Sequence, residues 1–363
     1  MSKTFLSINF GCRVNSAETN QWSQILINQN YIPTKTNPDL ILINTCSITK
    51  KGELESLGKV RQLNKLYPNA KIYVTGCANL EKIKDIPNIS IFKNSQKENL
   101  LKDLKSSYTP KIKDKFSHTN RFLLKIQSGC TQFCSYCIVP FRRPNLWSLK
   151  IEDAINTVNS AVKDGYQEII ITGVNLDQYE FGFSNLVQNI LEKTNIKLIS
   201  FGSIPINCID NKFIEILKNE CKSDSCGRLS HFLHIPIQSG SDKILKLMNR
   251  PYDSKKIIEI FNKIKSLPVK GGARRAEGFD FGTDIIVGFP GETEQDFQKT
   301  LNLCQKIGFS KIHTFKYSSR PGTKAKIIHD TNPKISKEIL KSRSQQIRFI
   351  DQNTLPSHQK LDK

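Results

Sequence analysis

The residues best suited to chemistry are three cysteines that lie close together in the stretch "QSGCTQFCSYCIVPF" (127–141). They are Cys130, Cys134 and Cys137. Disulfides are rare in the reducing cytosol, where clustered thiols are more often metal ligands or catalytic groups. The CxxxCxxC spacing gives an iron–sulfur cluster three protein ligands and leaves one iron open for a small molecule. A zinc site usually closes with a fourth protein ligand, and we find none close by in the sequence.

Three more cysteines, Cys12, Cys46 and Cys77, each follow a predicted strand, in "FGC", "NTC" and "TGC". The carboxyl ends of parallel strands lie together at one edge of a sheet, so we expect these thiols to converge. Soft sulfur ligands favour zinc or an iron–sulfur cluster. The structural alternative is that they are small buried hydrophobic groups. The other cysteines share no spacing; they are Cys208, Cys221, Cys226 and Cys304.

The elements that must position the early thiols alternate between strand and helix. Strands are predicted at 4–10, 40–44, 71–75 and 89–92, and helices at 18–29, 53–66 and 97–105. This alternation is typical of a parallel, Rossmann-like α/β domain, which we place at residues 1–107. A polar, aperiodic segment at 108–120 is the predicted linker.

After the linker the alternation restarts. Strands are predicted at 122–127, 168–172, 197–201, 231–237, 281–287 and 311–317, and helices at 151–164, 184–194, 210–219, 254–265 and 293–306. Successive βα units predict a partial (β/α)6 TIM barrel over 121–340, with active groups on the loops after its strands. The insert at 270–280 is expected to be a surface loop, and 341–363 a basic, polar C-terminal tail.

The composition is that of a globular protein with a strongly basic balance. Of 363 residues, 38% are hydrophobic and 24% charged, and the formal net charge is +21. Such a charge suits a polyanionic partner, and nucleic acid is the obvious one. The alternative is that abundant lysine, asparagine and isoleucine reflect an AT-rich genome. No apolar run approaches the roughly 18 residues of a membrane span, and the start lacks a signal peptide's apolar segment, so we expect a cytoplasmic protein without membrane contact.

Several phrases give the sequence a resemblance to the radical-SAM methylthiotransferase family. Besides the CxxxCxxC motif, they are "GCRVNSAET" (11–19), "NTCSIT" (44–49), "VTGC" (74–77), "HIPIQSGSDKILKLMNR" (234–250), "TDIIVGFPGET" (283–293) and "YSSRPGTKA" (317–325). Together they cover residues 4 to about 345.

The resemblance implies two 4Fe–4S clusters. Cys130, Cys134 and Cys137 would bind the cluster whose open iron chelates S-adenosylmethionine, and one electron would cleave that cofactor to a 5′-deoxyadenosyl radical. The other three early cysteines would hold an auxiliary cluster that carries the sulfur to be inserted, and a second S-adenosylmethionine would supply the methyl group. The resemblance also places S-adenosylmethionine contacts at Tyr136, Gly173, Val174, Asn175, Ser203, Gln238 and Arg250. The structural alternatives are a turn at "TGVN" (172–175) and a helix cap at Arg250.

Substrates divide this family. Most members modify an adenosine beside the tRNA anticodon, and one branch modifies an aspartate on a ribosomal protein. The phrases "GCRVNSAE" and "NTCSIT" most resemble the branch that acts on threonylcarbamoyladenosine, whereas the isopentenyladenosine branch more often reads GCQMN. We therefore expect the tRNA anticodon stem-loop and an electron donor such as flavodoxin or ferredoxin as partners, and a monomer.

The sequence departs from the family in three places. The stretch "FIDQNTLPSHQKLDK" (349–363) is too short for the family's usual C-terminal RNA-binding β-barrel, so we expect either that the partial TIM barrel and the basic surface suffice for RNA or that the sequence is a fragment. In the loop at 140–153, Arg143 and Ser148 fit the family pattern, but Pro144 replaces a glycine and Leu149 an arginine that belong to a substrate-contacting loop. The insert at 270–280 has no counterpart in the family pattern.

Two functions of other classes compete. A radical-SAM methyltransferase or oxidoreductase without sulfur insertion would leave the three early cysteines unexplained. A zinc-stabilised RNA-binding protein would need no catalysis and would contain zinc rather than iron.

Overall fold

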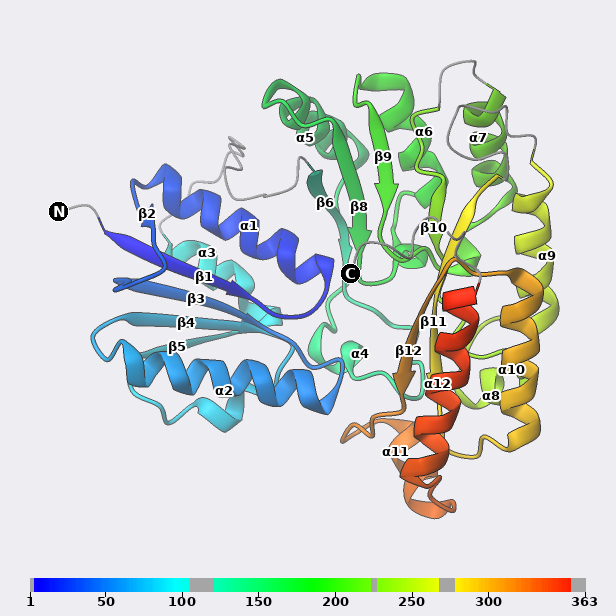
Figure 1. Ribbon diagram of the computed structural model, residues 1–363. Coiled ribbons are helices and arrows are strands. Elements are labelled where there is room, and N and C mark those ends of the chain that lie inside the picture. The colour runs from blue at the N-terminus through cyan, green and yellow to red at the C-terminus, as the bar shows by residue number, and fades with distance from the viewer. Residues whose placement is uncertain (1–2, 105–120, 223–226, 268–277, 354–363) are drawn as a thin grey trace. The chain divides into compact units, whose positions relative to one another are not determined.

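The computed structural model describes residues 3–104, 121–222, 227–267 and 278–353 (Figure 1). The chain divides into two compact units. The first comprises residues 1–132, 137–181 and 192–196, and the second 133–136, 182–191 and 197–363. The predicted linker, most of the 270–280 insert and the end of the predicted tail lie outside the described residues. Among those residues no helix is both long and apolar enough to cross a bilayer.

The first unit is built on a five-stranded parallel sheet in the order β2-β1-β3-β4-β5. Its strands are β1 (Thr4–Asn9), β2 (Ile32–Pro33), β3 (Leu40–Thr45), β4 (Lys71–Gly76) and β5 (Ile89–Lys93). All six residues of β3 are buried, as expected of a central strand that is covered on both faces. Because β1, β3 and β4 are parallel neighbours, their carboxyl ends share one edge.

Helices cover both faces of this sheet (Figure 1). They are α1 (Arg13–Asn28), α2 (Lys50–Leu66) and α3 (Lys97–Asp103), with short 3-10 turns η1 (Leu80–Ile83) and η2 (Asn94–Gln96). From α1, Trp22 and Leu26 pack with Leu42 on one face, in a cluster that α3 joins. From α2, Leu57 packs with Ile41 on the other face. Helix α1 begins earlier than predicted, because Cys12 is already its N-cap.

The first unit also contains the opening of the predicted barrel. Strand β6 (Arg121–Ser128) pairs in parallel with β8 (Glu168–Gly173) and antiparallel with the short β7 (Trp147–Ser148). The connecting elements are α4 (Val139–Arg142), α5 (Ile151–Lys163) and η3 (Leu176–Gln178).

The second unit is built on the parallel strands β10 (Phe232–His234), β11 (Asp280–Val287) and β12 (Lys311–Lys316). Single bridges connect the region of β9 (Leu198–Phe201) to the segment around β10. Its remaining elements are α6 (Phe183–Lys193), η4 (Ile206–Cys208), α7 (Asn211–Lys222), α8 (Asp242–Leu247), α9 (Ser254–Lys265), α10 (Glu294–Ile307), α11 (Lys324–Thr331) and α12 (Lys337–Asn353).

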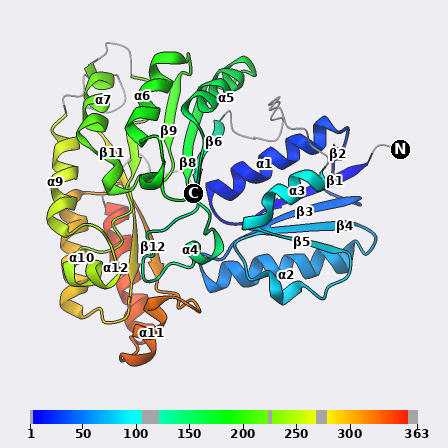
Figure 2. The ribbon, with the colours of Figure 1, turned by 180° about the vertical axis from the view of Figure 1, so that it is seen from behind.

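Helices α9, α10 and α12 lie along one side of this sheet (Figure 2). Phe261 of α9 packs edge-to-face on Phe281 of β11, with ring centroids 4.9 Å apart. The predicted fold class, a parallel α/β domain followed by a partial barrel, is confirmed, and the described strands do not close into a complete barrel. Residues 341–353 of the predicted tail belong to α12.

Candidate active site

The structure brings the thiols of Cys12, Cys46 and Cys77 to one edge of the first sheet. They follow β1, β3 and β4, and the Cys77 loop is fixed by a 2.9 Å bond from its amide to the Thr45 carbonyl. Burial raises the pKa of the Cys46 thiol, and the thiols of Cys77 and Cys12 raise it further. The three sulfurs therefore lie close enough to interact electrostatically.

A glycine precedes two of these thiols for a steric reason. Gly11 has a φ of +97°, and a Cβ there would lie 2.9 Å from the Cys46 sulfur. Gly76 has a φ of +108°, and a Cβ there would lie 2.4 Å from the backbone of Thr45. Only glycine combines this backbone conformation with this close approach.

The chemistry of this donor set tests which metal centre it fits. Soft thiolate ligands suit zinc or an iron–sulfur cluster. A structural zinc site usually has four protein ligands, whereas three thiolates can hold a 4Fe–4S cluster and leave one iron open. The three cysteines therefore fit an iron–sulfur cluster.

Arg143 connects this edge to the CxxxCxxC loop. Its Nε donates to the Cys77 sulfur at 3.3 Å, and its main-chain carbonyl accepts a 3.3 Å bond from the Cys130 amide. The guanidinium also donates to both carboxylate oxygens of Glu18, at 2.8 and 2.9 Å, and to Asn15 Oδ1 at 2.7 Å. Arg143 is only 4% exposed, so it is held inside the protein rather than offered to a substrate.

Glu18 is the only carboxylate paired with Arg143 in the described structure, and two lysines share it. Lys125 Nζ lies 3.2 Å from Glu18 Oε1, and Lys97 contacts Oε2. Burial opposes ionisation of Glu18, but Lys97, Arg143 and Lys125 together hold the pKa of its carboxyl well below the usual range. Burial also opposes ionisation of Lys97, and it lowers the pKa of that amine to about 8. Three cations thus surround one buried carboxylate beside the thiol of Cys77.

The CxxxCxxC loop is anchored within each unit separately. In the first unit, Asn175 Nδ2 lies 3.7 Å from the Cys130 sulfur, and the Val139 amide donates to the Cys137 sulfur at 3.4 Å. In the second unit, Arg250 donates to the Cys134 sulfur at 3.1 Å and to the Tyr252 hydroxyl at 2.8 Å. The Arg250 side chain therefore faces the CxxxCxxC loop, while its main-chain amide caps the preceding helix with a 2.9 Å bond to the Leu245 carbonyl.

The other predicted S-adenosylmethionine contacts lie at the last residue of a strand or after a strand, except for Tyr136 in the CxxxCxxC loop. In the first unit, the Asn175 amide donates to Gln127 Oε1 at 2.8 Å, and a Cβ at Gly173 would lie 2.7 Å from Leu176. In the second unit, Ser203 bridges to His234, and Gln238 has a φ of +68°. Val174 lies between Gly173 and Asn175, and Tyr136 packs in a hydrophobic cluster with Met248.

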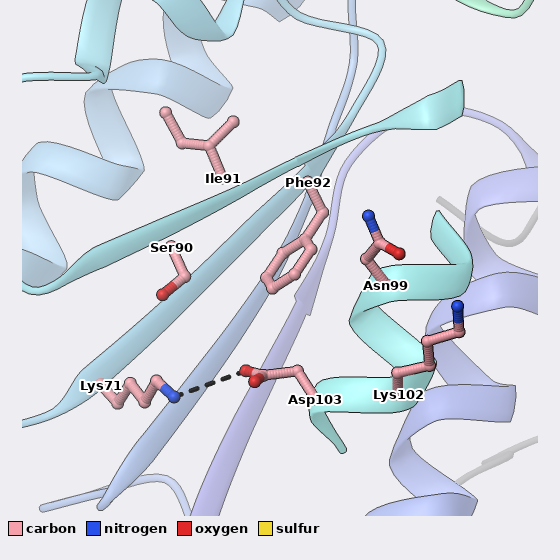
Figure 3. Close-up of a pocket in the computed structure, with 7 residues that line it drawn as sticks. All are labelled: Lys71, Ser90, Ile91, Phe92, Asn99, Lys102 and Asp103. Carbon is pink, nitrogen blue, oxygen red and sulfur yellow. Dashed lines mark hydrogen bonds and ion pairs between the residues drawn. The ribbon is translucent and has the colours of Figure 1, made fainter. Parts of the chain in front are cut away.

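A pocket of about 560 Å³ also opens in the first unit (Figure 3). It is lined by Lys71, Ser90, Ile91, Phe92, Asn99, Lys102 and Asp103. Lys71, which pairs with Asp103 at 3.4 Å, begins β4, whereas Cys77 follows the other end of that strand. The pocket therefore lies away from the thiols and contains no predicted site residue.

Comparisons with known proteins agree with this geometry. Residues 124–304 match the Radical SAM superfamily, and residues 4–93 match the Uncharacterized protein family UPF0004. The "Threonylcarbamoyladenosine tRNA methylthiotransferase MtaB" of Chlamydia pneumoniae is 32% identical, over 89% of this chain and 76% of its own length. The chain belongs to the radical-SAM methylthiotransferase family.

A second relative supports the family, and a solved structure shows a similar fold. A "tRNA-2-methylthio-N(6)-dimethylallyladenosine synthase" of Staphylococcus haemolyticus is 30% identical, over 95% of this chain and 70% of its own length. The solved structure of the radical S-adenosylmethionine methyltransferase TsrM from Kitasatospora setae has a TM-score of 0.64 at 10% identity. It covers 90% of this chain and 77% of its own, and it shows a likeness of fold alone.

As a member of this family the chain is an enzyme that uses S-adenosylmethionine and two 4Fe–4S clusters, which confirms the predicted cofactors. Sequence reasoning named Arg143 only as a match to a substrate-contacting loop, and it assigned no role to Glu18, Asn15 or Lys97. The available signal was the position of Asn15 and Glu18 inside "GCRVNSAET" (11–19).

Proposed function

We propose that this chain is a tRNA methylthiotransferase that modifies carbon 2 of an adenosine beside the anticodon, and that the adenosine carries an N6-threonylcarbamoyl group. The observation that supports it most is the joining of the two cysteine sets through Arg143. This arrangement suits a reaction that needs sulfur and a radical at one substrate atom. The names of the relatives support tRNA as the substrate, and "GCRVNSAE" (11–18) favours threonylcarbamoyl over dimethylallyl.

The residue assignments follow the two cysteine sets. We assign Cys12, Cys46 and Cys77 to the auxiliary cluster, and Cys130, Cys134 and Cys137 to the other. We assign to S-adenosylmethionine the residues Tyr136, Gly173, Val174, Asn175, Ser203, Gln238 and Arg250. When bound, the two clusters and S-adenosylmethionine would supply the radical, the sulfur and the methyl group.

The chain's own residues hold and orient this chemistry. Arg143 directs a charge-assisted hydrogen bond at the Cys77 sulfur, and Arg250 does the same at the Cys134 sulfur. Phe133, at a φ of +48°, turns the loop between the first two cysteines of the motif, and Asn249 donates to its carbonyl at 3.1 Å. The excess of basic residues suits a phosphate backbone. An electron donor such as a flavodoxin or ferredoxin, and a monomeric state, complete the proposal.

The test begins with metal content. We would reconstitute wild type anaerobically beside a Cys12/Cys46/Cys77→Ala triple variant, with Cys304→Ala as a control because Cys304 is buried outside both sets. Iron should fall from about eight to about four per chain in the triple variant only, with S-adenosylmethionine cleavage retained. Mass spectrometry of a modified anticodon stem-loop should then show the methylthio product with wild type and Cys304→Ala but not with the triple variant.

Two outcomes would contradict the proposal. Zinc in place of iron would favour a zinc-stabilised RNA-binding protein. Iron that does not fall in the triple variant would leave no auxiliary cluster and therefore no sulfur donor.

A further inference from the structure

Three polar side chains meet on neighbouring parallel strands of the second unit. They are His234 on β10, Asp284 on β11 and His313 on β12. His234 Nε2 lies 3.1 Å from Asp284 Oδ1, and His313 Nδ1 lies 3.3 Å from the same oxygen. His234 is buried, Asp284 is partly exposed, and the His313 side chain is 48% exposed. We call these residues the His–Asp–His triad.

The triad lies on the sheet face opposite α9. Phe281 packs on that helix, so Gly282 and Asp284, one and three residues further along β11, point to the other face. Gly282 pairs with His234, and a Cβ at Gly282 would lie 2.8 Å from His234 Nδ1. The glycine therefore makes room for the imidazole.

Residues predicted to contact S-adenosylmethionine border the triad. The Gln238 amide donates to the Asp284 carbonyl at 2.9 Å, and Ser203 bridges to His234. Ile286, two residues after Asp284 on the same face, packs in the cluster that contains Tyr136. The triad thus lies on a strand face beside residues predicted to contact S-adenosylmethionine, where a group of the substrate can reach it.

We infer that the His–Asp–His triad binds the polar substituent on N6 of the target adenosine, an inference that rests on the proposed function. A threonylcarbamoyl group offers a carboxylate, a hydroxyl and amide N–H groups, which two imidazoles and a carboxylate can pair. A dimethylallyl group is a hydrocarbon. It would shield the same polar atoms from water without offering them hydrogen-bond partners, which weakens binding. His313, the most exposed of the three, contacts the substituent and distinguishes a polar group from a hydrocarbon.

The same spacing would also suit a divalent cation, because two histidines and a carboxylate are a common metal set. Zinc analysis in the test below therefore separates a resident metal from a substrate group.

The test uses reconstituted holoenzyme and two anticodon stem-loops, one with threonylcarbamoyl and one with dimethylallyl on N6 of the target adenosine. His313→Phe and Asp284→Asn are compared with wild type. Thr314→Val is the matched control, because Thr314 neighbours His313 on β12 and its buried hydroxyl has no hydrogen-bond partner. Dissociation constants come from fluorescence anisotropy, and product ratios in competition come from mass spectrometry.

Wild type and Thr314→Val should prefer the threonylcarbamoyl RNA, and each triad variant should lose roughly 10- to 100-fold of that preference. Retained S-adenosylmethionine cleavage would show that the variants fold. An unchanged preference in both triad variants, or a wild-type preference for dimethylallyl, would overturn the inference. So would one Zn²⁺ per chain, retained by wild type on dialysis and lost in Asp284→Asn. Failure of the proposed function looks different: neither RNA is methylthiolated, while the binding preference still tests the triad.

Discussion

Replacing Arg143 with methionine removes the side chain that joins the Cys77 loop to the interior of the first unit. The change breaks both bonds to Glu18 and leaves Asn15 Oδ1 and Ser128 Oγ without this donor. Removing one partner of a buried ion pair typically costs 3–5 kcal/mol. Because Glu18 keeps its two lysines, we expect the lower end, about 3 kcal/mol, and a melting temperature lower by roughly 6–12 °C.

The assay can report on the first unit alone. The chain has two tryptophans, Trp22 and Trp147, and both belong to that unit. Thermal unfolding of the apo-protein, followed by tryptophan fluorescence, therefore measures the unfolding of the first unit. Iron counting after reconstitution gives a second readout, because a Cys77 loop without its arginine should retain less of the auxiliary cluster. S-adenosylmethionine cleavage should persist, since the bond from Cys130 goes to the main chain of residue 143.

Arg142→Met is the matched control for this variant. It removes the same charge from the adjacent residue, but no hydrogen bond from the Arg142 side chain to another described residue exists, and its Nε is buried without a partner. If Arg143→Met matched Arg142→Met in both melting temperature and iron content, the structural role of Arg143 would be refuted.

Two further predictions concern the same unit. The folded state holds the Glu18 pKa below its ordinary 4.5, so its stabilising contribution is present above about pH 4.5 and is lost as the pH falls through the folded-state pKa. Glu18→Gln should therefore be less stable than wild type at pH 7 in denaturant titrations. We expect the upper end of the range, about 5 kcal/mol, because three cations lose their shared carboxylate, and the difference should shrink in acid. Gly11→Ala should lower auxiliary iron, because its Cβ would meet the Cys46 sulfur. Gly165 has a similar φ of +92° but open space around it, so Gly165→Ala should lower stability and leave the iron content unchanged. Equal iron loss in both variants would contradict the steric explanation.

Much of this fold could be predicted because its strands are short, apolar and regularly spaced by helices. Every strand expected from the sequence exists within a few residues of its predicted bounds. The convergence of three thiols followed from one general rule about parallel strand ends. Helix α12 was not predicted, because its buried side chains are few and two of them, Arg343 and Ser344, are polar.

The Arg143 network lay beyond sequence reasoning for a different reason. Glu18 and Arg143 are 125 positions apart, and no periodicity or spacing in the sequence marks two such residues as partners. An arginine in a loop and a glutamate near the start of a helix each look like ordinary surface residues. Only the packing of α1 against β6 shows that both are buried.

The charge around Cys77 explains why such a network is present. Arg143, Lys97 and Lys125 bring three positive charges to one carboxylate, and surplus charge in a poorly solvated region is costly unless an opposite charge faces it. A metal-bound thiolate at Cys77, whose sulfur lies 3.3 Å from Arg143 Nε, would supply part of that opposite charge. If the cysteines were only small buried hydrophobic groups, apolar neighbours would serve them better than an arginine and two lysines. The network is therefore an independent reason to regard these thiols as ligands.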